Sequence, residues 1–322
     1  IINRYRLVIL CNIIMSNKEL LTKKSASRDF FSGIIDYAGF FPPAQLEYLH
    51  ALANYIDYSA SEYRWILSRF ISPTEKFKQL AQFFSEKSID KDIDLVAILR
   101  PHEDIDTYIS KLPDELEAMN SLPDNVRVSF IETKLPSNIL THDISSAVNS
   151  LVETFKAVKY HRMFLEFSGE NYINYDVNNY VDSVGIKVRC GGPTLNLVPS
   201  VELLSETIVY AADNKIPVKF TAGLHHPILH FDPVLGGMAH GFLNVFMASA
   251  MAYSNPANYK YIYEVLNDQD PENFIFNTDS VSYKDCTLPS ELIQDIRKEY
   301  VHSFGTCSFD DPITDLTSLG II

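Results

Sequence analysis

Two lysines stand within short apolar segments that each run into glycine. Lys187 lies in GIKVRCGG (185–192), and Lys219 lies in VKFTAG (218–223). Side chains alternate between the two faces of a strand, so each lysine points away from its apolar neighbours. If the apolar faces meet surrounding helices, both lysines point into the interior, where a cation needs an anionic partner or a chemical role. A buried lysine can be the nucleophile that forms an imine with a carbonyl compound.

Acidic and basic side chains also end or interrupt the other apolar segments. Carboxylates can carry protons or pair with the lysines, and arginine suits an anionic substrate. The predicted catalytic residues are Lys219, Lys187, Glu166 and Asp36. The predicted substrate-binding residues are Arg189, Arg69, Arg100, Glu132, Thr221, Gly191, Gly192, His240 and Asn244. The alternative for the two lysines is an ion-pair network with carboxylates that only fills the interior.

Histidines gather after the second lysine segment, where His225, His226, His230 and His240 account for four of the nine in the chain. Imidazole is a metal ligand or a general acid and base near neutral pH. A zinc site needs three or more ligands. His225 and His226 with Glu166, and Asp36 nearby, are therefore candidate ligands of a divalent metal. Loop or capping roles account equally well for His230 and His240.

These residues need elements that hold them together, and the sequence alternates short β-branched runs with segments of helical spacing. The predicted strands are Ser32–Asp36, Ser68–Ile71, Asp94–Leu99, Arg127–Glu132, Met163–Phe167, Gly185–Arg189, Pro217–Thr221 and Phe274–Asn277. The predicted helical stretches include Gln45–Tyr55, Thr74–Glu86, Ile144–Lys159, Val201–Asn214 and Phe242–Tyr253. Such alternation is typical of βαβ units with a parallel sheet.

Eight such units in about 290 residues match an α/β fold with a single (β/α)₈ TIM-like barrel. The alternative is an open doubly wound sheet, which usually has a glycine-rich turn after its first strand. The first strand here leads into YAGFFPP, which is no such turn. In a barrel the chemistry lies at the carboxyl ends of the strands. The segment SFGTCSFDDP (303–312) is predicted to be a tail packed on the barrel, with Cys307 in a structural role.

The predicted domain spans residues 30–322, and residues 1–29 are predicted to be an extension outside the core. Residues 1–14, IINRYRLVILCNII, resemble the start of a signal peptide, but no small-residue cleavage site follows. Met15-Ser16-Asn17-Lys18 resembles an ordinary cytosolic start, so we expect residues 1–14 to lie upstream of it or to form an appendage. We expect a cytoplasmic protein, since the four cysteines form no CxxC pair and are typical of free thiols.

The composition excludes several classes of protein. With 46% hydrophobic and 21% charged residues, the chain can bury a large core and is not disordered. The formal net charge is −14, and no run of Lys or Arg forms a basic patch, so nucleic acid is not an expected partner. No apolar run reaches the length of about 18 residues that a membrane span needs. A homo-oligomer is a candidate assembly, because barrels often associate.

Five segments together resemble a family of uncharacterised bacterial β/α-barrel-domain proteins. They are IIDYAGFFPPA (34–44), GIKVRCGG (185–192), VKFTAGLHHP (218–227), HGFLNVFMAS (240–249) and SFGTCSFDDP (303–312). The resemblance runs from near residue 30 to near residue 320. It implies the barrel and leaves the reaction open.

A local resemblance concerns the two lysine segments. IKVRCGG and VKFTAG are similar to the lysine strands of deoxyribose-phosphate-type class I aldolases. That resemblance implies that Lys219 forms the imine and that Lys187 helps to keep it unprotonated. The pair His225 and His226 is not part of that pattern.

Three functions follow as hypotheses, each with a small anionic substrate such as a carboxylate or a phosphate. The first is a lyase of the aldolase type that forms an imine on Lys219. The second is a metal-dependent hydrolase or lyase that uses the region of His225 and His226. The third is a barrel that binds a small ligand without turning it over.

Overall fold

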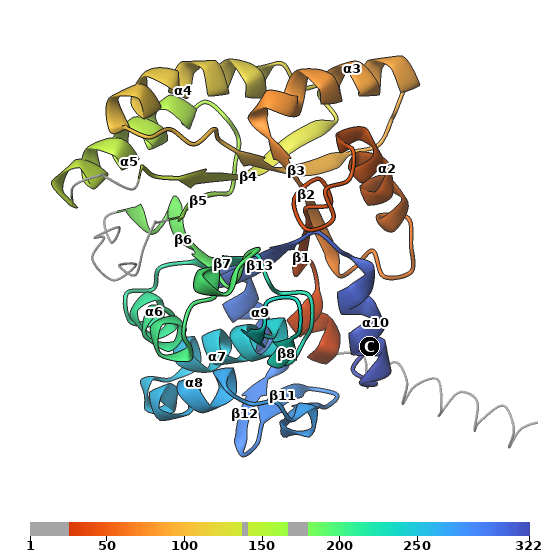
Figure 1. Cartoon of the computed structure of the whole chain (residues 1–322), viewed down its shortest axis with the longest axis vertical. Coiled ribbons are helices and arrows are strands. Elements are labelled where there is room, and N and C mark those ends of the chain that lie inside the picture. Colours follow the sequence, from red (N-terminus) through yellow and green to blue (C-terminus); the bar gives the residue numbers. More distant parts are fainter. Residues whose placement is uncertain (1–25, 137–140, 167–179) are drawn as a thin grey trace, which may run out of the picture.

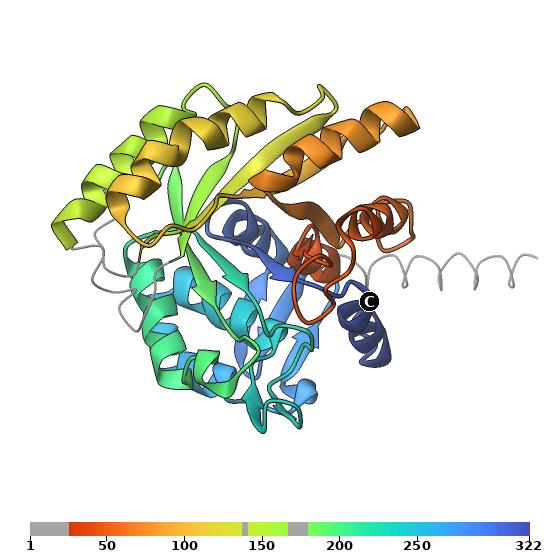
Figure 2. The same cartoon turned by 45° about the horizontal axis from the view of Figure 1, so that its top comes forward.

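Eight parallel strands close into a barrel, each joined to its two neighbours by backbone hydrogen bonds (Figures 1 and 2). The computed structural model describes residues 26–136, 141–166 and 180–322. Around the barrel the strands follow the order β1, β13, β7, β6, β5, β4, β3 and β2. Helices surround the closed sheet (Figure 2). The predicted (β/α)₈ barrel is confirmed.

The strands of the barrel are short, and most are followed by a helix. They are β1 (Ile35–Tyr37), β2 (Leu67–Pro73), β3 (Ile93–Ile98), β4 (Val126–Lys134), β5 (Arg162–Glu166), β6 (Val184–Arg189), β7 (Val218–Thr221) and β13 (Val301–Thr306). The helices are α2 (Tyr48–Tyr58), α3 (Phe77–Lys87), α4 (Ile105–Asn120), α5 (Thr141–Phe155), α6 (Val201–Asp213), α7 (Phe242–Ser254), α8 (Tyr259–Leu266), α9 (Ser290–Glu299) and α10 (Asp310–Ser318).

Smaller elements are inserted in the last third of the chain. A hairpin of β8 (His230–Asp232) and β9 (Gly237–Ala239) follows β7, and a three-stranded antiparallel sheet lies between α8 and α9. That sheet consists of β10 (Phe274–Phe276), β11 (Ser280–Tyr283) and β12 (Cys286–Pro289). Single 3₁₀ turns are η1 (Thr74–Lys76), η4 (Leu195–Leu197), η5 (Pro256–Asn258) and η6 (Pro271–Asn273).

The core lies between the outer face of the barrel and the helices. Phe220 of β7 and Phe304 of β13 are fully buried and pack on Phe246 and Phe242 of α7, with ring centroids 5.0–5.8 Å apart. Burying a phenylalanine side chain contributes roughly 1.5–3 kcal/mol. Because apolar side chains occupy the outward positions of β7, its alternate residues point into the barrel. No helix in the described ranges is long and apolar enough to cross a membrane.

The predicted eighth strand is wrong. Phe274–Phe276 pairs antiparallel with β11 outside the barrel, whereas β13 closes the barrel between β7 and β1. β13 has the sequence VHSFGT, in which His302, Ser303 and Gly305 interrupt the apolar pattern. The predicted tail 303–312 therefore contains the last four residues of a barrel strand, and only the residues after them leave the barrel.

The end of the chain packs against the first helix of the barrel. The Tyr58 hydroxyl of α2 donates a hydrogen bond to Asp310 Oδ2 at 2.9 Å, and its ring lies 4.8 Å from that of Phe309. At the other end, residues 26–31 are helical, and Ala26 and Ser27 are buried. Residues 1–14, Met15 and Cys11 lie outside the described residues, as does Phe167, the predicted last residue of the fifth strand.

Candidate active site

A chain of alternating charges crosses the interior of the barrel. Lys219 Nζ lies 2.5 Å from Asp36 Oδ2 and also contacts Glu132 Oε1. Lys187 Nζ lies 2.8 Å from Glu132 Oε2 and 3.1 Å from Glu166 Oε2. The two lysines are direct neighbours in the register of β6 and β7. Both point inward, as the alternation of side chains predicts, and each sits between two carboxylates from other strands.

Both ends of this chain of charges have further partners. At one end, Arg189 Nε lies 3.2 Å from Glu166 Oε1, and its Nη1 donates to the Gly191 carbonyl at 3.1 Å. At the other end, Asp36 Oδ1 accepts from the backbone N–H of Arg69 at 3.1 Å, and its Oδ2 accepts from the Ser303 hydroxyl at 2.5 Å. Sequence reasoning missed Ser303, because it assigned that residue to a tail.

The contacts in the network hold Glu132, Lys187 and Glu166 in their charged forms. Burial raises the pKa of Glu132, but the ammonium groups of Lys187 and Lys219 more than offset it and lower that pKa to about 2. Burial lowers the pKa of Lys187, but Glu132 and Glu166 outweigh it and raise that pKa. The pKa of Glu166 is lowered in the same way, by Lys187 and Arg189 acting against burial. At neutral pH Glu132 and Glu166 are therefore carboxylates, and Lys187 between them is an ammonium.

Exposure rises along the network. Lys219 is 0% exposed, and Asp36 and Glu132 beside it are buried too. Lys187 is 7% exposed, and the side chain of Arg189 is 36% exposed. Arg189 is the last residue of β6, so the more exposed end of the network lies at the carboxyl ends of the strands. Of the two lysines, Lys187 is the one that pairs with the carboxylate next to Arg189.

Aromatic rings fill the barrel below the charged residues. Phe130 and Phe164 stand two residues before Glu132 and Glu166 on the same strands, and their ring centroids are 5.1 Å apart. The His302 ring packs on both, and burial lowers its pKa well below the ordinary value. These rings close the interior toward the amino ends of the strands.

The loops after β6 and β7 are in close contact at the mouth. A Cβ atom on Gly191 would lie 2.7 Å from Gly223 Cα, so only glycine permits this approach. Ala222 has φ +62°, a left-handed conformation that costs roughly 1–2 kcal/mol in a residue with a Cβ. Thr221 is the register partner of Arg189 and ends β7 beside them. Strain of this kind is often found at functional sites.

Three predicted substrate-binding residues make contacts away from the network. Arg100 Nε lies 2.6 Å from Glu115 of α4. His240 Nε2 lies 2.8 Å from the Pro199 carbonyl. Asn244 is fully buried, and its side chain bonds only to backbone: it accepts from Leu229 N–H and donates to the carbonyls of Val265 and Asp268. These side chains hold loops and helices together. Gly192 packs against Leu197 in the loop after β6.

The predicted metal ligands are not brought together. His225 and His226 face α10, with Nδ1 atoms 3.7 Å from Asp311 Oδ2 and 2.6 Å from Asp315 Oδ2. Glu166 instead contacts Lys187 and Arg189. Within residues 26–136, 141–166 and 180–322, no three His, Cys, Asp or Glu side chains are grouped so as to hold a metal ion. Sequence spacing placed the histidines near the mouth but could not show which way they turn.

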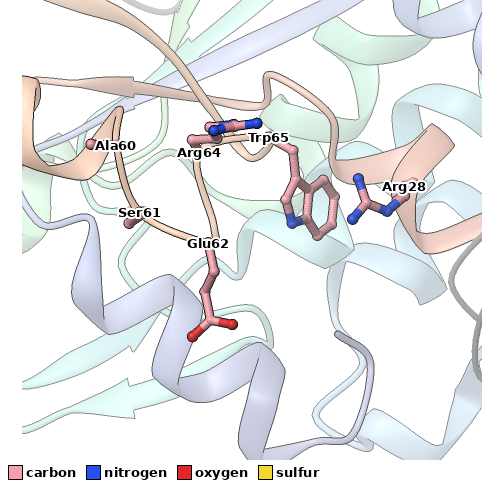
Figure 3. A pocket seen from close by; sticks show the side chains of 6 residues that line it. All are labelled: Arg28, Ala60, Ser61, Glu62, Arg64 and Trp65. Atoms are coloured by element: carbon pink, nitrogen blue, oxygen red, sulfur yellow. The ribbon is translucent and has the colours of Figure 1, made fainter.

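A separate hollow of about 320 Å³ is lined mainly by residues that precede β2 in the chain (Figure 3). It therefore lies toward the amino ends of the barrel strands. It is lined by Arg28, Ala60, Ser61, Glu62, Arg64 and Trp65. The Arg28 guanidinium lies 4.8 Å from the centre of the Trp65 ring, which is a cation–π contact. The hollow contains none of the predicted site residues.

No protein-family model and no curated protein matches this chain. Among solved structures, the chain is similar to one described as "a putative deoxyribose-phosphate aldolase from Toxoplasma gondii ME49". The identity is 11%, the match covers 92% of this chain and 94% of that chain, and the TM-score is 0.38. A likeness at this level assigns no residue a role.

Proposed function

We propose that this protein is a lyase of the aldolase type that forms an imine between Lys187 and a small anionic carbonyl compound. The observation that carries the proposal is the position of Lys187. It lies between Glu132 and Glu166, at 2.8 and 3.1 Å, at the end of the charged network that opens toward the strand ends. Active sites of (β/α)₈ enzymes lie at those ends.

The proposal exchanges the roles that the sequence suggested for the two lysines. Lys219 is fully buried and lies between Asp36 and Glu132, so a carbonyl carbon reaches its Nζ only if the network opens. Lys187 is buried as well, but it keeps 7% of its surface and lies on the side of the network that ends in the more exposed Arg189. Lys219 then acts as a positioning residue, because it fixes Glu132, and Glu132 in turn holds Lys187.

Glu166 can move the protons that imine formation requires. At rest this pair is charged, because the pKa of Lys187 is raised and that of Glu166 is lowered. The Lys187 ammonium therefore transfers its proton to the Glu166 carboxylate 3.1 Å away in an uphill step, and the neutral amine attacks the carbonyl carbon. The resulting hydroxyl takes the proton back from Glu166 and leaves as water. The iminium that forms carries the same charge as the ammonium it replaces, so Glu132 and Glu166 stabilise it by the same contacts. It then withdraws electrons from the adjacent carbon–carbon bond.

The residues around the mouth suit an anionic group on the substrate. The Arg189 guanidinium reaches from Glu166 to the Gly191 carbonyl and is partly exposed. Guanidinium groups bind carboxylates and phosphates in a fork-like geometry. Together with the close glycine loops, this position favours a small substrate that carries a carboxylate or a phosphate.

Borohydride trapping tests the proposal. The protein is incubated with small aldehydes, keto acids and sugar phosphates, reduced with borohydride and mapped by mass spectrometry. We expect one reduced adduct on Lys187, which K187M abolishes. K284M is the matched control, because Lys284 pairs with Glu264 on the surface. An adduct on Lys219 instead would restore the first assignment. Thermal stabilisation by a ligand with no adduct on either lysine would favour a binding protein and refute the lyase.

A further inference from the structure

A thiol, an imidazole and a carboxylate meet at another part of the barrel mouth. Cys307 is the first residue after β13, and its Sγ lies 3.9 Å from His225 Nε2. His225 belongs to the loop after β7, and its Nδ1 lies 3.7 Å from Asp311 Oδ2 of α10. One ring nitrogen thus faces the thiol and the other faces the carboxylate. This order of groups is the one that activates cysteine nucleophiles.

At rest this pair is a neutral thiol and a neutral imidazole, so sulfur gives up its proton to nitrogen only as it bonds to a carbonyl carbon. Burial raises the pKa of Cys307, so the resting group is the thiol. Burial lowers the pKa of His225 although Asp311 acts in the opposite direction, so the resting imidazole is neutral and can accept a proton. The other titratable groups near this cluster are Tyr37, which interacts with Cys307, and His226 and Asp232, which interact with His225.

The cluster is reachable from solvent on one side. The His225 side chain is 23% exposed, and Cys307 keeps 8% of its surface. Cys190 and Cys286 serve as internal comparisons. Cys190 is buried, and its thiol lies 4.0 Å from the Val188 carbonyl, while Cys286 is half-buried in β12. Of the described cysteines, Cys307 is the one with an imidazole within reach.

We infer that Cys307, His225 and Asp311 form a second nucleophilic site, which adds the thiol to a small aldehyde. His225 Nε2 takes the proton from the thiol, and the S–H bond breaks. Sulfur bonds to the carbonyl carbon while the carbonyl π electrons move to oxygen. The oxygen then takes the proton from the imidazolium, which gives a hemithioacetal without oxidation or reduction. Asp311 stabilises the imidazolium in between. The inference does not depend on imine formation at Lys187.

The rate of alkylation tests the activation of the thiol. The full chain is treated with iodoacetamide between pH 6 and pH 9, and each cysteine peptide is followed by mass spectrometry. At pH 7 we expect Cys307 to react about tenfold faster in wild type than in H225N, because the imidazole takes the proton as sulfur attacks. H226N is the matched control, because His226 pairs with Asp315, and it should keep the wild-type rate. An unchanged rate in H225N, or an equal loss in H226N, overturns the inference.

Protection by acetaldehyde tests the class of ligand. The same labelling is repeated with acetaldehyde in wild type and in K187M, which cannot form the proposed imine. We expect acetaldehyde to slow labelling of Cys307 in both proteins and labelling of Cys286 in neither. Protection in wild type alone would trace the effect to Lys187, and no protection in either protein would exclude an aldehyde site at Cys307. Circular dichroism of each variant checks that the fold is intact.

Discussion

Replacing Lys219 by methionine keeps a long side chain and removes the charge between two buried carboxylates. Asp36 keeps the Ser303 hydroxyl, the Arg69 backbone N–H and the Arg69 guanidinium at 3.5 Å, and Glu132 keeps Lys187 at 2.8 Å. Each nevertheless loses its contact with Lys219 inside the barrel. Removing one member of a buried ion pair costs about 3–5 kcal/mol when the remaining charge stays uncompensated. Because Arg69 and Lys187 compensate part of the remaining charge, we expect the free energy of unfolding of K219M to fall by about 3 kcal/mol at pH 7.5, the lower end of that range.

The destabilisation caused by K219M should become smaller as the pH falls. In wild type the pKa of Glu132 is lowered from 4.5 to about 2, so its stabilising contribution is complete above about pH 5 and is lost as the pH falls toward 2. Without Lys219, Glu132 loses one of the two cations that act against its burial, so its pKa rises above the wild-type value. A substitution that raises the pKa of a carboxyl group in the folded protein destabilises most at high pH, and the loss shrinks as the group binds a proton. The gap between K219M and wild type should therefore narrow from pH 7.5 to pH 5.

Urea unfolding followed by far-UV circular dichroism measures this gap at both pH values. K156M is the matched control, because the Lys156 side chain is 68% exposed and pairs with an exposed Glu153. Its free energy of unfolding should change by less than about 1 kcal/mol. The reasoning is refuted if K219M unfolds within about 0.5 kcal/mol of wild type, the range of ordinary surface substitutions. It is also refuted if the gap widens as the pH falls.

Three substitutions test the packing around the site. S303A removes the 2.5 Å hydrogen bond to the Asp36 carboxylate and should lower the free energy of unfolding by about 1.5–3 kcal/mol in urea. G185A places a Cβ 2.7 Å from the Phe164 ring, so overpacking should cost about 1–3 kcal/mol and lower the Tm in calorimetry. N244A leaves the Leu229 N–H unpaired, so we expect faster hydrogen exchange at that amide. Unchanged exchange would contradict the role of Asn244 in fixing the loop after β7.

The sequence correctly predicted the barrel strands in which apolar residues that face outward alternate with residues that face the barrel interior. β6 and β7 are of this kind, with Val188 and Phe220 facing the helices. β13 escaped prediction because its interior positions hold Ser303 and Gly305. Phe274–Phe276 has a stronger apolar pattern but pairs with β11, and hydropathy does not reveal the partner of a strand.

For the candidate site, the sequence predicted toward which face of a strand a side chain points. Alternation showed that Lys187 and Lys219 face inward, and neighbouring strands suggested Glu132 and Glu166 as partners. Contacts between distant segments were not predictable, such as Ser303 with Asp36 and Cys307 with His225. Exposure was not predictable either, so the sequence could not show which of the two lysines a substrate reaches.

The distribution of charge within the barrel favours chemistry over mere filling. Apolar residues of similar volume would fill the interior at equal or better stability than ion pairs. Phe130 and Phe164 show this solution near the amino ends of the strands. Charged residues follow them on the same strands, and exposure increases from Lys219 to Lys187. A network that only filled space would have no reason to open where (β/α)₈ enzymes bind their substrates. We therefore expect its outer lysine, Lys187, to be the residue that reacts.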